Sequence, residues 1–384
     1  MMNKKPLAVY LHIPFCVRKC LYCDFLSGPA TKEVKRQYVE TLKKDCRQTL
    51  LQLSNDYVVT SVFFGGGTPS LLEDEQLAGL LAAVASSIEV EEKAEITLEA
   101  NPGTVTEEKL RNLYVAGFNR ISFGLQSANN EELEALGRIH TYEEFLESFH
   151  GARKAGFANI NVDLMYNLPK QTRSSWKHTL GTVLQLKPEH VSAYSLIIEE
   201  ETPFYERYQE GSFRYPTEEE QEQLDSITKG MLEGAGYRQY EISNYAKEGF
   251  ACLHNQTYWK RGDYIGLGLG AASLLDEERF SRTRDLQEYE KQGKSGSFLK
   301  EEVQKLTKKE AMEEFMFLGL RMTEGVAEAD FAACFGSTLQ EIYGKQLEML
   351  VKQGLLVVED GRVFLSKKGF PVANQVMVHF LLEE

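Results

Sequence analysis

Three cysteines stand close together near the amino terminus, in the run HIPFCVRKCLYC. Cys16, Cys20 and Cys23 follow a Cys-x3-Cys-x2-Cys spacing, so one loop could bring three thiolates to a single metal centre. A [4Fe-4S] cluster has four irons, and three cysteine ligands would leave one iron open to a substrate or cofactor. The spacing therefore predicts a metal centre that takes part in chemistry rather than one that only supports the fold.

Other uses of these cysteines are weaker alternatives. His12 stands four residues before Cys16, so the ligand count also allows a Cys3His zinc site. Disulfides are disfavoured, because the sequence shows neither a secretory signal nor a stretch of transmembrane length, and cytosolic thiols are usually kept reduced. We therefore expect a cytoplasmic protein. The scattered Cys46, Cys252 and Cys334 are expected to be small buried hydrophobic residues.

The chain has 384 residues, with 43 basic and 57 acidic side chains and a net charge of -14. This length allows one large domain and a smaller one. The acidic balance argues against a partner held mainly through phosphate contacts, so a nucleic-acid partner is not expected. Peripheral contact with a membrane is compatible with the sequence.

Strand-like and helix-like segments alternate along the first half of the chain. Short apolar runs predict strands, and amphipathic helices separate them, for example over 32–53, 73–87, 106–116, 141–155 and 171–186. This order is typical of an α/β fold with a parallel sheet and crossover helices. Six units are fewer than the eight of a closed barrel, so we expect a partial (β/α)6 barrel. The predicted strands cover 8–13, 58–64, 95–100, 120–126, 158–166 and 190–197.

The pattern changes after about residue 245, which divides the chain into three predicted regions. The barrel covers 1–245, a connecting region with the HNQTYW motif covers 246–300, and a carboxyl-terminal domain covers 301–384. In the last region a helix over 307–321 precedes a hairpin whose turn is Asp360-Gly361, as in a helical, winged-helix-like unit. Because it lacks a basic stripe, we expect it to pack or to cover a substrate rather than to read DNA. The glycine-rich run YIGLGLGAAS predicts close backbone packing at the barrel mouth.

Polar residues gather where the predicted strands end. The cysteine loop, the GGGTP run, Glu99, Gln126 and Asp163 each follow or close a strand. The carboxyl ends of parallel strands meet at one edge, where functional groups of such folds collect. The sequence therefore predicts that these groups share one face.

Several motifs carry a family resemblance over nearly the whole chain. CVRKCLYC, GGGTPS and the strand-end carboxylates resemble the radical S-adenosylmethionine (SAM) superfamily. A longer set narrows the resemblance to the group of oxygen-independent coproporphyrinogen III dehydrogenases and haem chaperones of the HemW type. These motifs are LHIPFC, FFGGGTPS, LEANPG, SFGLQS, LGRIHT, INVDLMYNLP, YEISNYA and HNQTYW.

The resemblance implies a partial radical SAM barrel that binds a [4Fe-4S] cluster and SAM. It implies that the three cysteines hold the cluster and that the amino and carboxylate groups of SAM chelate the fourth iron. Arg138 would then grip the SAM carboxylate through two parallel hydrogen bonds, and the glycines would let the backbone approach the ligand. No catalytic residue is assigned. The SAM contacts implied are Tyr10, Tyr22, Gly66, Gly67, Thr68, Glu99, Gln126, Arg138 and Asp163.

The HNQTYW motif and two departures from the dehydrogenase pattern bear on the function. His254 is a candidate axial haem ligand, with Tyr258 and Trp259 to cover the macrocycle; the alternative is a structural histidine beside core aromatics. Dehydrogenases of the group typically have an amino-terminal extension and a further cysteine two residues after the third ligand. Here only fifteen residues precede Cys16, and Phe25 occupies that position.

These differences favour a haem chaperone that passes haem to an acceptor haemoprotein, such as a respiratory one. A coproporphyrinogen III dehydrogenase is the alternative, and a radical enzyme acting on RNA is a weaker one. The sequence identifies no electron donor.

Overall fold

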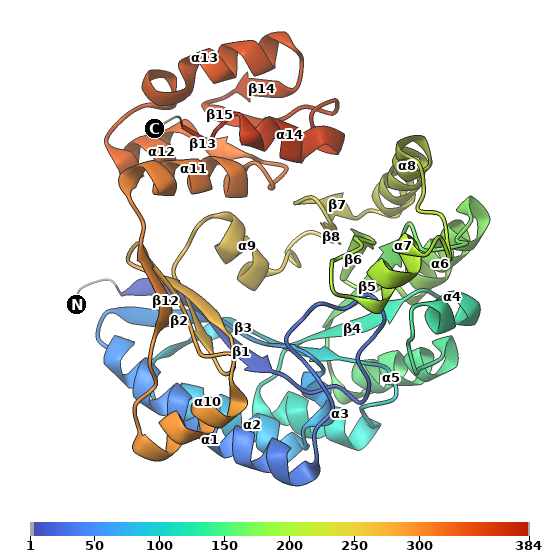
Figure 1. Ribbon diagram of the computed structural model, residues 1–384, viewed down its shortest axis with the longest axis vertical. Helices are drawn as coiled ribbons and strands as arrows, with labels where there is room; N and C mark the ends of the chain where they lie inside the picture. Colours follow the sequence, from blue (N-terminus) through green and yellow to red (C-terminus); the bar gives the residue numbers. More distant parts are fainter. Residues whose placement is uncertain (1–3, 383–384) are drawn as a thin grey trace.

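The computed structural model describes residues 4–382, which are built around one large sheet (Figure 1). Its central strands are parallel and lie side by side in chain order, each joined to the next by a crossover helix. The six strands predicted for the barrel are confirmed. Their bounds are β1 (Lys5–Ile13), β2 (Tyr57–Gly66), β3 (Val90–Ala100), β4 (Arg120–Gln126), β5 (Asn159–Tyr166) and β6 (His190–Ser195).

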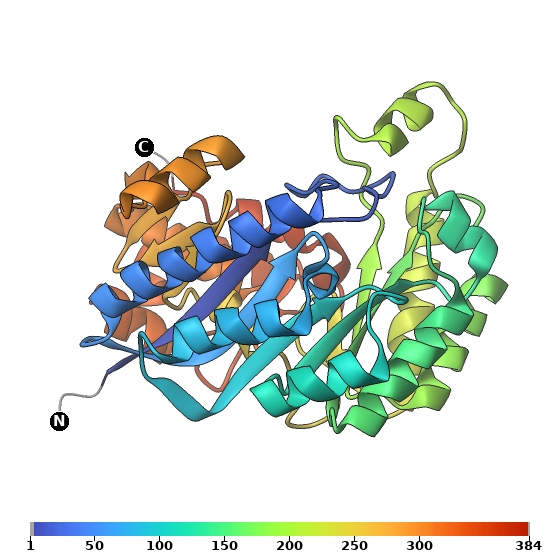
Figure 2. The same cartoon turned by 90° about the horizontal axis from the view of Figure 1, so that it is seen from below.

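The predicted crossover helices cover the outer face of this sheet, as Figure 2 shows. Threonine side chains cap the first turns of most of them; Thr31 and Thr141, for example, accept hydrogen bonds from the backbone N–H groups of Val34 and Glu144. The apolar sides of the helices pack on the sheet and form the main hydrophobic core. The predicted helices are α1 (Lys32–Leu53), α2 (Asp74–Ala85), α3 (Glu107–Ala116), α5 (Tyr142–Ala155) and α6 (Arg173–Leu186), and the structure adds α4 (Asn130–Ala135), α7 (Pro203–Gln209) and α8 (Glu218–Gly234).

The sheet extends beyond the barrel strands at both edges. At one edge β9 (Tyr264–Leu267) pairs parallel with β1, and β10 (Ala272–Leu275), β11 (Glu278–Ser281) and β12 (Glu301–Lys305) continue antiparallel. At the other edge β8 (Asn244–Ala246) and β7 (Arg238–Gln239) follow β6. The region expected to connect two domains, 246–300, thus contributes β9, β10 and β11 to the same sheet, and α10 (Leu286–Ser295) packs on α1.

The glycine-rich run between β9 and β10 packs as closely as predicted. Gly268 has a φ of +98°, and a Cβ atom there would lie 2.6 Å from the Tyr38 hydroxyl. That hydroxyl donates to the His12 carbonyl oxygen at 2.7 Å and accepts from the Leu269 N–H at 3.0 Å. The run therefore supports the end of β1, from which the cysteine loop leaves.

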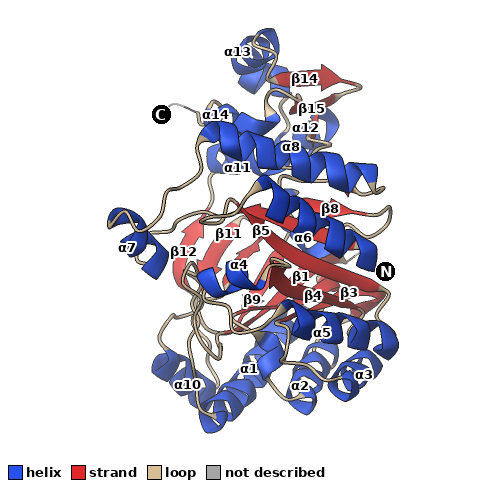
Figure 3. Cartoon of the chain, turned by 90° about the vertical axis from the view of Figure 1, so that its right-hand side faces the viewer, coloured by secondary structure: helices blue, strands red, loops and turns tan. Residues whose placement is uncertain are grey.

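The carboxyl-terminal part has its own small sheet and its own hydrophobic cluster. Its helix-strand-helix-helix-strand-strand order matches the winged-helix-like unit that was expected, and Asp360-Gly361 makes the turn with positive φ at both residues. Figure 3 shows this part on the side of the sheet away from α1, α2, α3 and α5. Its elements are α11 (Lys308–Gly319), β13 (Val326–Ala327), α12 (Glu328–Phe335), α13 (Leu339–Lys352), β14 (Leu356–Glu359), β15 (Arg362–Leu365), the 3-10 helix η2 (Phe370–Val372) and α14 (Ala373–Val378).

One cysteine prediction is wrong. Cys334 is exposed on α12, because the buried face of that helix is formed by Phe331 and Phe335. Cys46 and Cys252 are buried, as expected. Across residues 4–382 we find no helix with the length and apolar character needed to cross a bilayer.

The HNQTYW motif forms the short helix α9 (Leu253–Trp259), which lies between the sheet and the carboxyl-terminal part (Figure 1). It packs against β2 on one side and α11 on the other. On the α11 side, the Arg321 guanidinium stands 4.3 Å from the centre of the Trp259 ring, and Arg261 pairs with Glu314 at 3.1 Å. Helix α9 therefore contacts both the sheet and the carboxyl-terminal part.

Candidate functional site

The cysteine loop leaves the carboxyl end of β1 and is closed at its base by the backbone. The Cys16 N–H donates to the Gly28 carbonyl oxygen at 3.0 Å, and the Gly28 N–H donates to the Pro14 carbonyl oxygen at 3.0 Å. None of the three cysteines of the loop forms a disulfide, and all three are half-buried. Burial raises the pKa of the Cys23 thiol, with the Phe25 backbone N–H acting in the opposite direction. These two backbone hydrogen bonds close the base of the loop, so its three thiols lie near the carboxyl ends of the parallel strands.

Two predicted SAM contacts touch predicted cluster ligands directly. The Thr68 hydroxyl donates to Cys16 Sγ at 3.7 Å, and Arg138 Nη1 donates to Cys20 Sγ at 3.5 Å. Thr68 is the residue before the 3-10 helix η1 (Pro69–Leu71), and Arg138 follows α4. Tyr22 lies beside Arg138, as their mutual effect on each other's pKa indicates. Segments far apart in the sequence therefore meet around the cysteine loop.

Asn101 also belongs to this part of the site, although it was not predicted from the sequence. Its side-chain N–H donates to Thr68 Oγ1 at 2.8 Å, and its carbonyl oxygen accepts from Arg138 Nη2 at 2.6 Å. The signal that could have found it is the LEANPG motif, in which Asn101 stands two residues after Glu99. A small cavity lies between Cys20, Thr68, Asn101 and Arg138.

The zinc alternative receives no support from the geometry. His12 Nδ1 is hydrogen-bonded to the Tyr10 hydroxyl at 3.1 Å and Nε2 to the Leu26 carbonyl oxygen at 2.9 Å, so both ring nitrogens are used inside the fold. Within residues 4–382, no three His, Cys, Asp or Glu side chains are already gathered around one point that would suit a metal ion. The three-cysteine ligand set for a cluster therefore stays a prediction, and it rests on the shared loop and on the groups that surround it.

Two orphaned polar atoms test whether the surrounding residues fit SAM. Gln126 Oε1 and Arg138 Nε are buried and have no hydrogen-bond partner. Buried polar atoms are almost always satisfied in folded proteins, so such a pair is expected where a polar ligand binds. Gly66 and Gly67 are required by internal packing, because a Cβ atom would lie 2.6 Å from the His12 ring at Gly66 and 2.7 Å from the Phe15 carbonyl oxygen at Gly67. The residues present thus fit a ligand with the polar groups of SAM.

Two predicted carboxylates lie deeper in the barrel. Glu99 Oε2 accepts a hydrogen bond from the Gly66 N–H at 3.2 Å, and burial together with the Asp163 charge raises the pKa of Glu99 to about 8. Asp163 accepts from the Ser122 hydroxyl at 3.0 Å and from the Asn161 side-chain N–H at 2.8 Å. Burial raises the pKa of Asp163 as well, although these hydrogen bonds oppose the rise.

The strands and α9 border a cavity of about 160 Å³ that is shared by three of the predicted SAM contacts and the predicted haem ligand. Tyr10, Glu99 and Asp163 line it from the sheet, and His254 lines it from α9. The volume is below the roughly 300 Å³ of pockets that hold a drug-sized ligand. A haem therefore cannot occupy this space unless α9 or its side chains move.

His254 is buried, and both of its ring nitrogens are engaged. Nδ1 is hydrogen-bonded to the Ser61 hydroxyl at 2.9 Å, and Nε2 to the Tyr258 hydroxyl at 2.8 Å. Burial, assisted by the Arg120 charge, lowers the pKa of His254 to about 3, so the ring is neutral. These contacts match the alternative in which His254 is a structural histidine beside core aromatics. Its role as an iron ligand stays a prediction. Trp259 lies under Arg321 and does not line the cavity.

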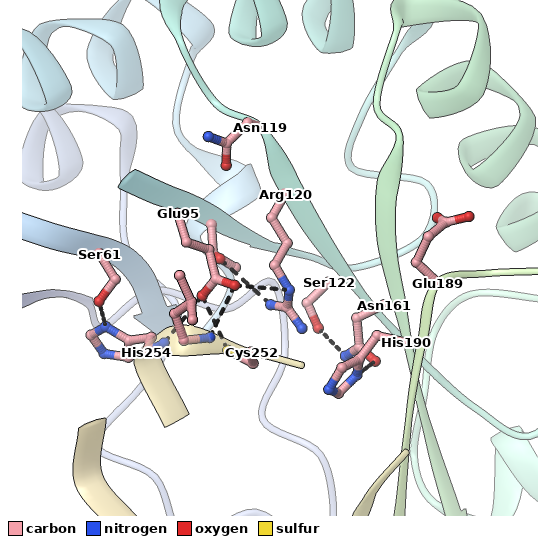
Figure 4. Close-up of polar contacts among 12 residues, drawn as sticks. Ser61, Glu95, Asn119, Arg120, Ser122, Asn161, Glu189, His190, Cys252 and His254 are labelled. Carbon is pink, nitrogen blue, oxygen red and sulfur yellow. Dashed lines mark hydrogen bonds and ion pairs between the residues drawn. The ribbon is translucent and has the colours of Figure 1, made fainter. Parts of the chain in front are cut away.

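A buried polar network that reaches the cavity wall at Arg120 and Asn161 was not predicted (Figure 4). Glu95 on β3 accepts hydrogen bonds from the first residues of α9, and Arg120 on β4 stands 3.9 Å from its carboxylate. Further along, His190 is hydrogen-bonded through Nδ1 to Asn161 at 2.6 Å and through Nε2 to the Tyr240 hydroxyl at 2.8 Å. The interior of the barrel is therefore lined with polar groups, most of which are hydrogen-bonded to one another, although Arg120 Nε has no hydrogen-bond partner.

Family comparisons cover the barrel and the carboxyl-terminal part. Residues 10–183 match the profile of the Radical SAM superfamily, and residues 306–372 match that of the HemN C-terminal domain. The chain is 37% identical over 383 residues to the Heme chaperone HemW of Lactococcus lactis, with 100% of this chain and 99% of that protein covered. It is 36% identical to the Heme chaperone HemW of Bacillus subtilis, with 98% and 99% covered.

A solved structure with the same fold is that of coproporphyrinogen III oxidase (HemN) from Escherichia coli. It superposes with a TM-score of 0.84 at 22% identity and covers 98% of this chain and 90% of that one. The likeness confirms the expected radical SAM fold and the presence of the carboxyl-terminal domain. A superfamily of this kind implies a [4Fe-4S] cluster and SAM.

Proposed function

Since the chain belongs to the HemW family of radical SAM proteins, we propose that it is a haem chaperone, which binds haem and transfers it to an acceptor haemoprotein. The observation that carries this proposal is the likeness to two HemW proteins over the full length of the chain. The position of α9 adds to it, because His254 lines the same cavity as Glu99 and Asp163. The cytoplasm is the proposed compartment, and a respiratory haemoprotein is the proposed acceptor.

The predicted site residues have separate roles in the proposed function. Cys16, Cys20 and Cys23 hold the cluster, which would supply an electron to SAM when both are bound. Arg138 is the cation for the SAM carboxylate. It already lies beside Cys20, so carboxylate and cluster would be held close together.

Glu99 and Asp163 accept hydrogen bonds from the donor groups of SAM, and Gln126 offers the free acceptor Oε1. His254 is the proposed iron ligand through Nε2. For iron to bind there, the Tyr258 hydroxyl must leave this nitrogen, and the ring must carry its proton on Nδ1 so that Nε2 offers its lone pair.

A parallel titration tests the function. Anaerobically reconstituted protein is titrated with haem and, separately, with coproporphyrinogen III, while absorbance and 5'-deoxyadenosine are followed. We expect about one haem per chain and no consumption of the porphyrinogen. His254→Ala should change the haem spectrum, whereas His178→Ala, which alters an exposed histidine on α6, should leave it as it is.

Two results would count against the proposal. Absence of a haem spectrum from protein with a fully loaded cluster would remove the chaperone function. Conversion of coproporphyrinogen III to protoporphyrinogen, with matching formation of 5'-deoxyadenosine, would establish the dehydrogenase alternative instead.

A further inference from the structure

Between β6 and α8 the chain makes a long excursion, residues 196–216, that reaches the cysteine loop; we call it the strap (Figure 2). Its base is closed by the Tyr215 hydroxyl, which donates to the Leu196 carbonyl oxygen. The Leu196 N–H in turn donates to the Tyr166 carbonyl oxygen at 2.9 Å, at the end of β5. The middle of the strap forms α7, whose first turn Thr202 caps by accepting a backbone N–H at 3.2 Å. The strap is therefore a closed, hydrogen-bonded element at the mouth of the barrel.

The strap holds the stretch between the second and third cysteines through the backbone. The Phe204 N–H donates to the Leu21 carbonyl oxygen at 3.0 Å, and the Leu21 N–H donates to the Leu136 carbonyl oxygen at 3.2 Å, at the end of α4. Both backbone groups of Leu21 are thus bonded to segments outside the cysteine loop. Inside the loop, the Cys23 N–H donates to the Cys20 carbonyl oxygen at 3.3 Å. The strap and α4 therefore hold, from two sides, the short turn that carries two of the three thiols.

A hydrophobic cluster covers the same contact. Leu21 and Tyr22 of the cysteine loop pack against it, with the Tyr22 and Phe204 ring centres 6.5 Å apart. Phe213, also on the strap, lies with its ring centre 5.5 Å from that of Phe204. Phe204 is only 1% exposed, so a smaller side chain there would leave a cavity beside the cysteine turn. The buried members of the cluster are Leu136, Met165, Leu168, Leu196 and Phe204.

This cluster is separate from the main core of the barrel. Among residues 4–382, none of its buried members belongs to the core that the crossover helices form with the sheet. Regions held by few apolar contacts open locally, without unfolding of the rest of the chain. A change at Phe204 should therefore be felt first in the cysteine loop and not in the barrel.

We propose that the strap positions the iron-sulfur site: Phe204 fixes the turn from Cys20 to Cys23, and its ring keeps water away from that side of the cluster. The proposal rests on the part of the proposed function that gives the cluster to these cysteines. The donor set fits, because three thiols share one loop and Thr68 and Arg138 already donate to two of them. Groups behind the ligands of a metal centre orient those ligands, and the apolar shell controls solvent access and reduction potential.

Hydrogen exchange of the cluster-free protein tests the mechanical part. Phe204→Ala and Phe204→Leu are compared in the full chain with Phe145→Leu, a matched change of a buried phenylalanine of α5 in the main core. We expect exchange of a peptide covering 17–24 to be about tenfold faster in Phe204→Ala and about threefold faster in Phe204→Leu. Phe145→Leu should leave this peptide as it is in the wild type.

The reconstituted protein supplies a readout that a loss of stability alone would not move. In Phe204→Ala the reduction potential and the electron paramagnetic resonance signals of the cluster should shift, because water reaches it from the side that the ring covers. Its absorbance should also bleach several-fold faster in air. Phe204→Leu keeps an apolar side chain and should lie between Phe204→Ala and the wild type. If Phe204→Ala does not fold, Phe204→Leu carries both measurements.

Three results would overturn the positioning role. They are wild-type exchange of 17–24 in both Phe204 variants, equal acceleration over the whole chain, and a variant cluster whose potential, signals and bleaching rate match the wild type. A wild-type chain that assembles no cluster would instead refute the assignment of the cysteines. The exchange measurement would then still decide whether Phe204 fixes the loop, so the two failures can be told apart.

Discussion

Glu99 should make SAM binding depend on pH. Its pKa is raised to about 8, first because burial disfavours the carboxylate and second because the Asp163 charge lies nearby. Near neutral pH the side chain is therefore mostly protonated in the free protein. A ligand whose amino or hydroxyl groups donate to Glu99 prefers the ionised form, so binding must expel this proton. We expect SAM to bind more tightly as the pH rises through 8.

The magnitude follows from the ionised fraction. With a pKa of about 8, about 1% of Glu99 is ionised at pH 6 and about 90% at pH 9, so the dissociation constant should fall roughly 90-fold between these values. Below pH 8 the slope should approach tenfold per pH unit. The same shift acts on folding: between its ordinary pKa and 8 the folded state keeps a proton that the unfolded state has lost, so stability without ligand should fall as pH rises.

The assay is equilibrium dialysis of SAM against protein with an oxidised cluster, between pH 6 and 9, with cluster absorbance recorded at each point. Glu99→Gln cannot titrate, so it should lose the part of the pH dependence that comes from Glu99 and show a shallower slope than the wild type across this range. Glu147→Gln serves as the matched control, because Glu147 is an exposed glutamate on α5. The reasoning is refuted if wild-type affinity is flat with pH, or if Glu99→Gln keeps the wild-type slope.

Three further predictions test other parts of the structure. Cys20→Ala should lose the iron-sulfur absorbance after reconstitution, and the exposed Cys334→Ala should keep it; a full cluster in the first variant would contradict the ligand assignment. Tyr258→Phe removes the hydroxyl that is bonded to His254 Nε2 and that iron would have to displace. Because such a hydrogen bond is worth about 1 kcal/mol, haem should bind this variant about fivefold more tightly. Unchanged or weaker binding in a haem titration would argue against Nε2 as the ligand. Asp45→Ala removes the carboxylate that pairs with buried Arg282 at 2.8 Å and should lower the free energy of unfolding in urea by about 3 kcal/mol, a value under about 1 kcal/mol being inconsistent with this role.

The barrel could be predicted from the sequence because its strands are long apolar runs between amphipathic helices. The runs at 8–13 and 120–126 are buried almost throughout, as expected for parallel strands covered on both faces. The strands β9, β10 and β11 were not predicted, because each has four residues and the glycine run beside them suggests a turn. Short segments of this kind are assigned by their neighbours in the sheet rather than by their own pattern.

The site could be predicted where a motif carries it, and not where a single polar residue sits inside a strand. Thr68 and Arg138 were expected near the cysteines, and the structure brings both to them. Glu95 and Arg120 were missed, because alternation along a strand cannot distinguish a face in water from a barrel interior that is itself polar. The packing of α9 on this face, with its first N–H groups bonded to Glu95, shows that the face is a polar barrel interior.

The interior network also constrains how the cavity can open. Asn161, His190 and the Tyr240 hydroxyl are linked in series, and Tyr240 accepts from the Cys252 N–H at 3.3 Å, one residue before α9. Cys252 is thus tied to Tyr240 through its backbone and to Glu95 through its thiol. A movement of α9 large enough to admit a porphyrin must break both ties at once, because a buried group left without its partner costs about 1–3 kcal/mol. Access to the cavity is therefore expected to be one cooperative step in which the whole helix leaves the sheet, rather than fraying of its first turn.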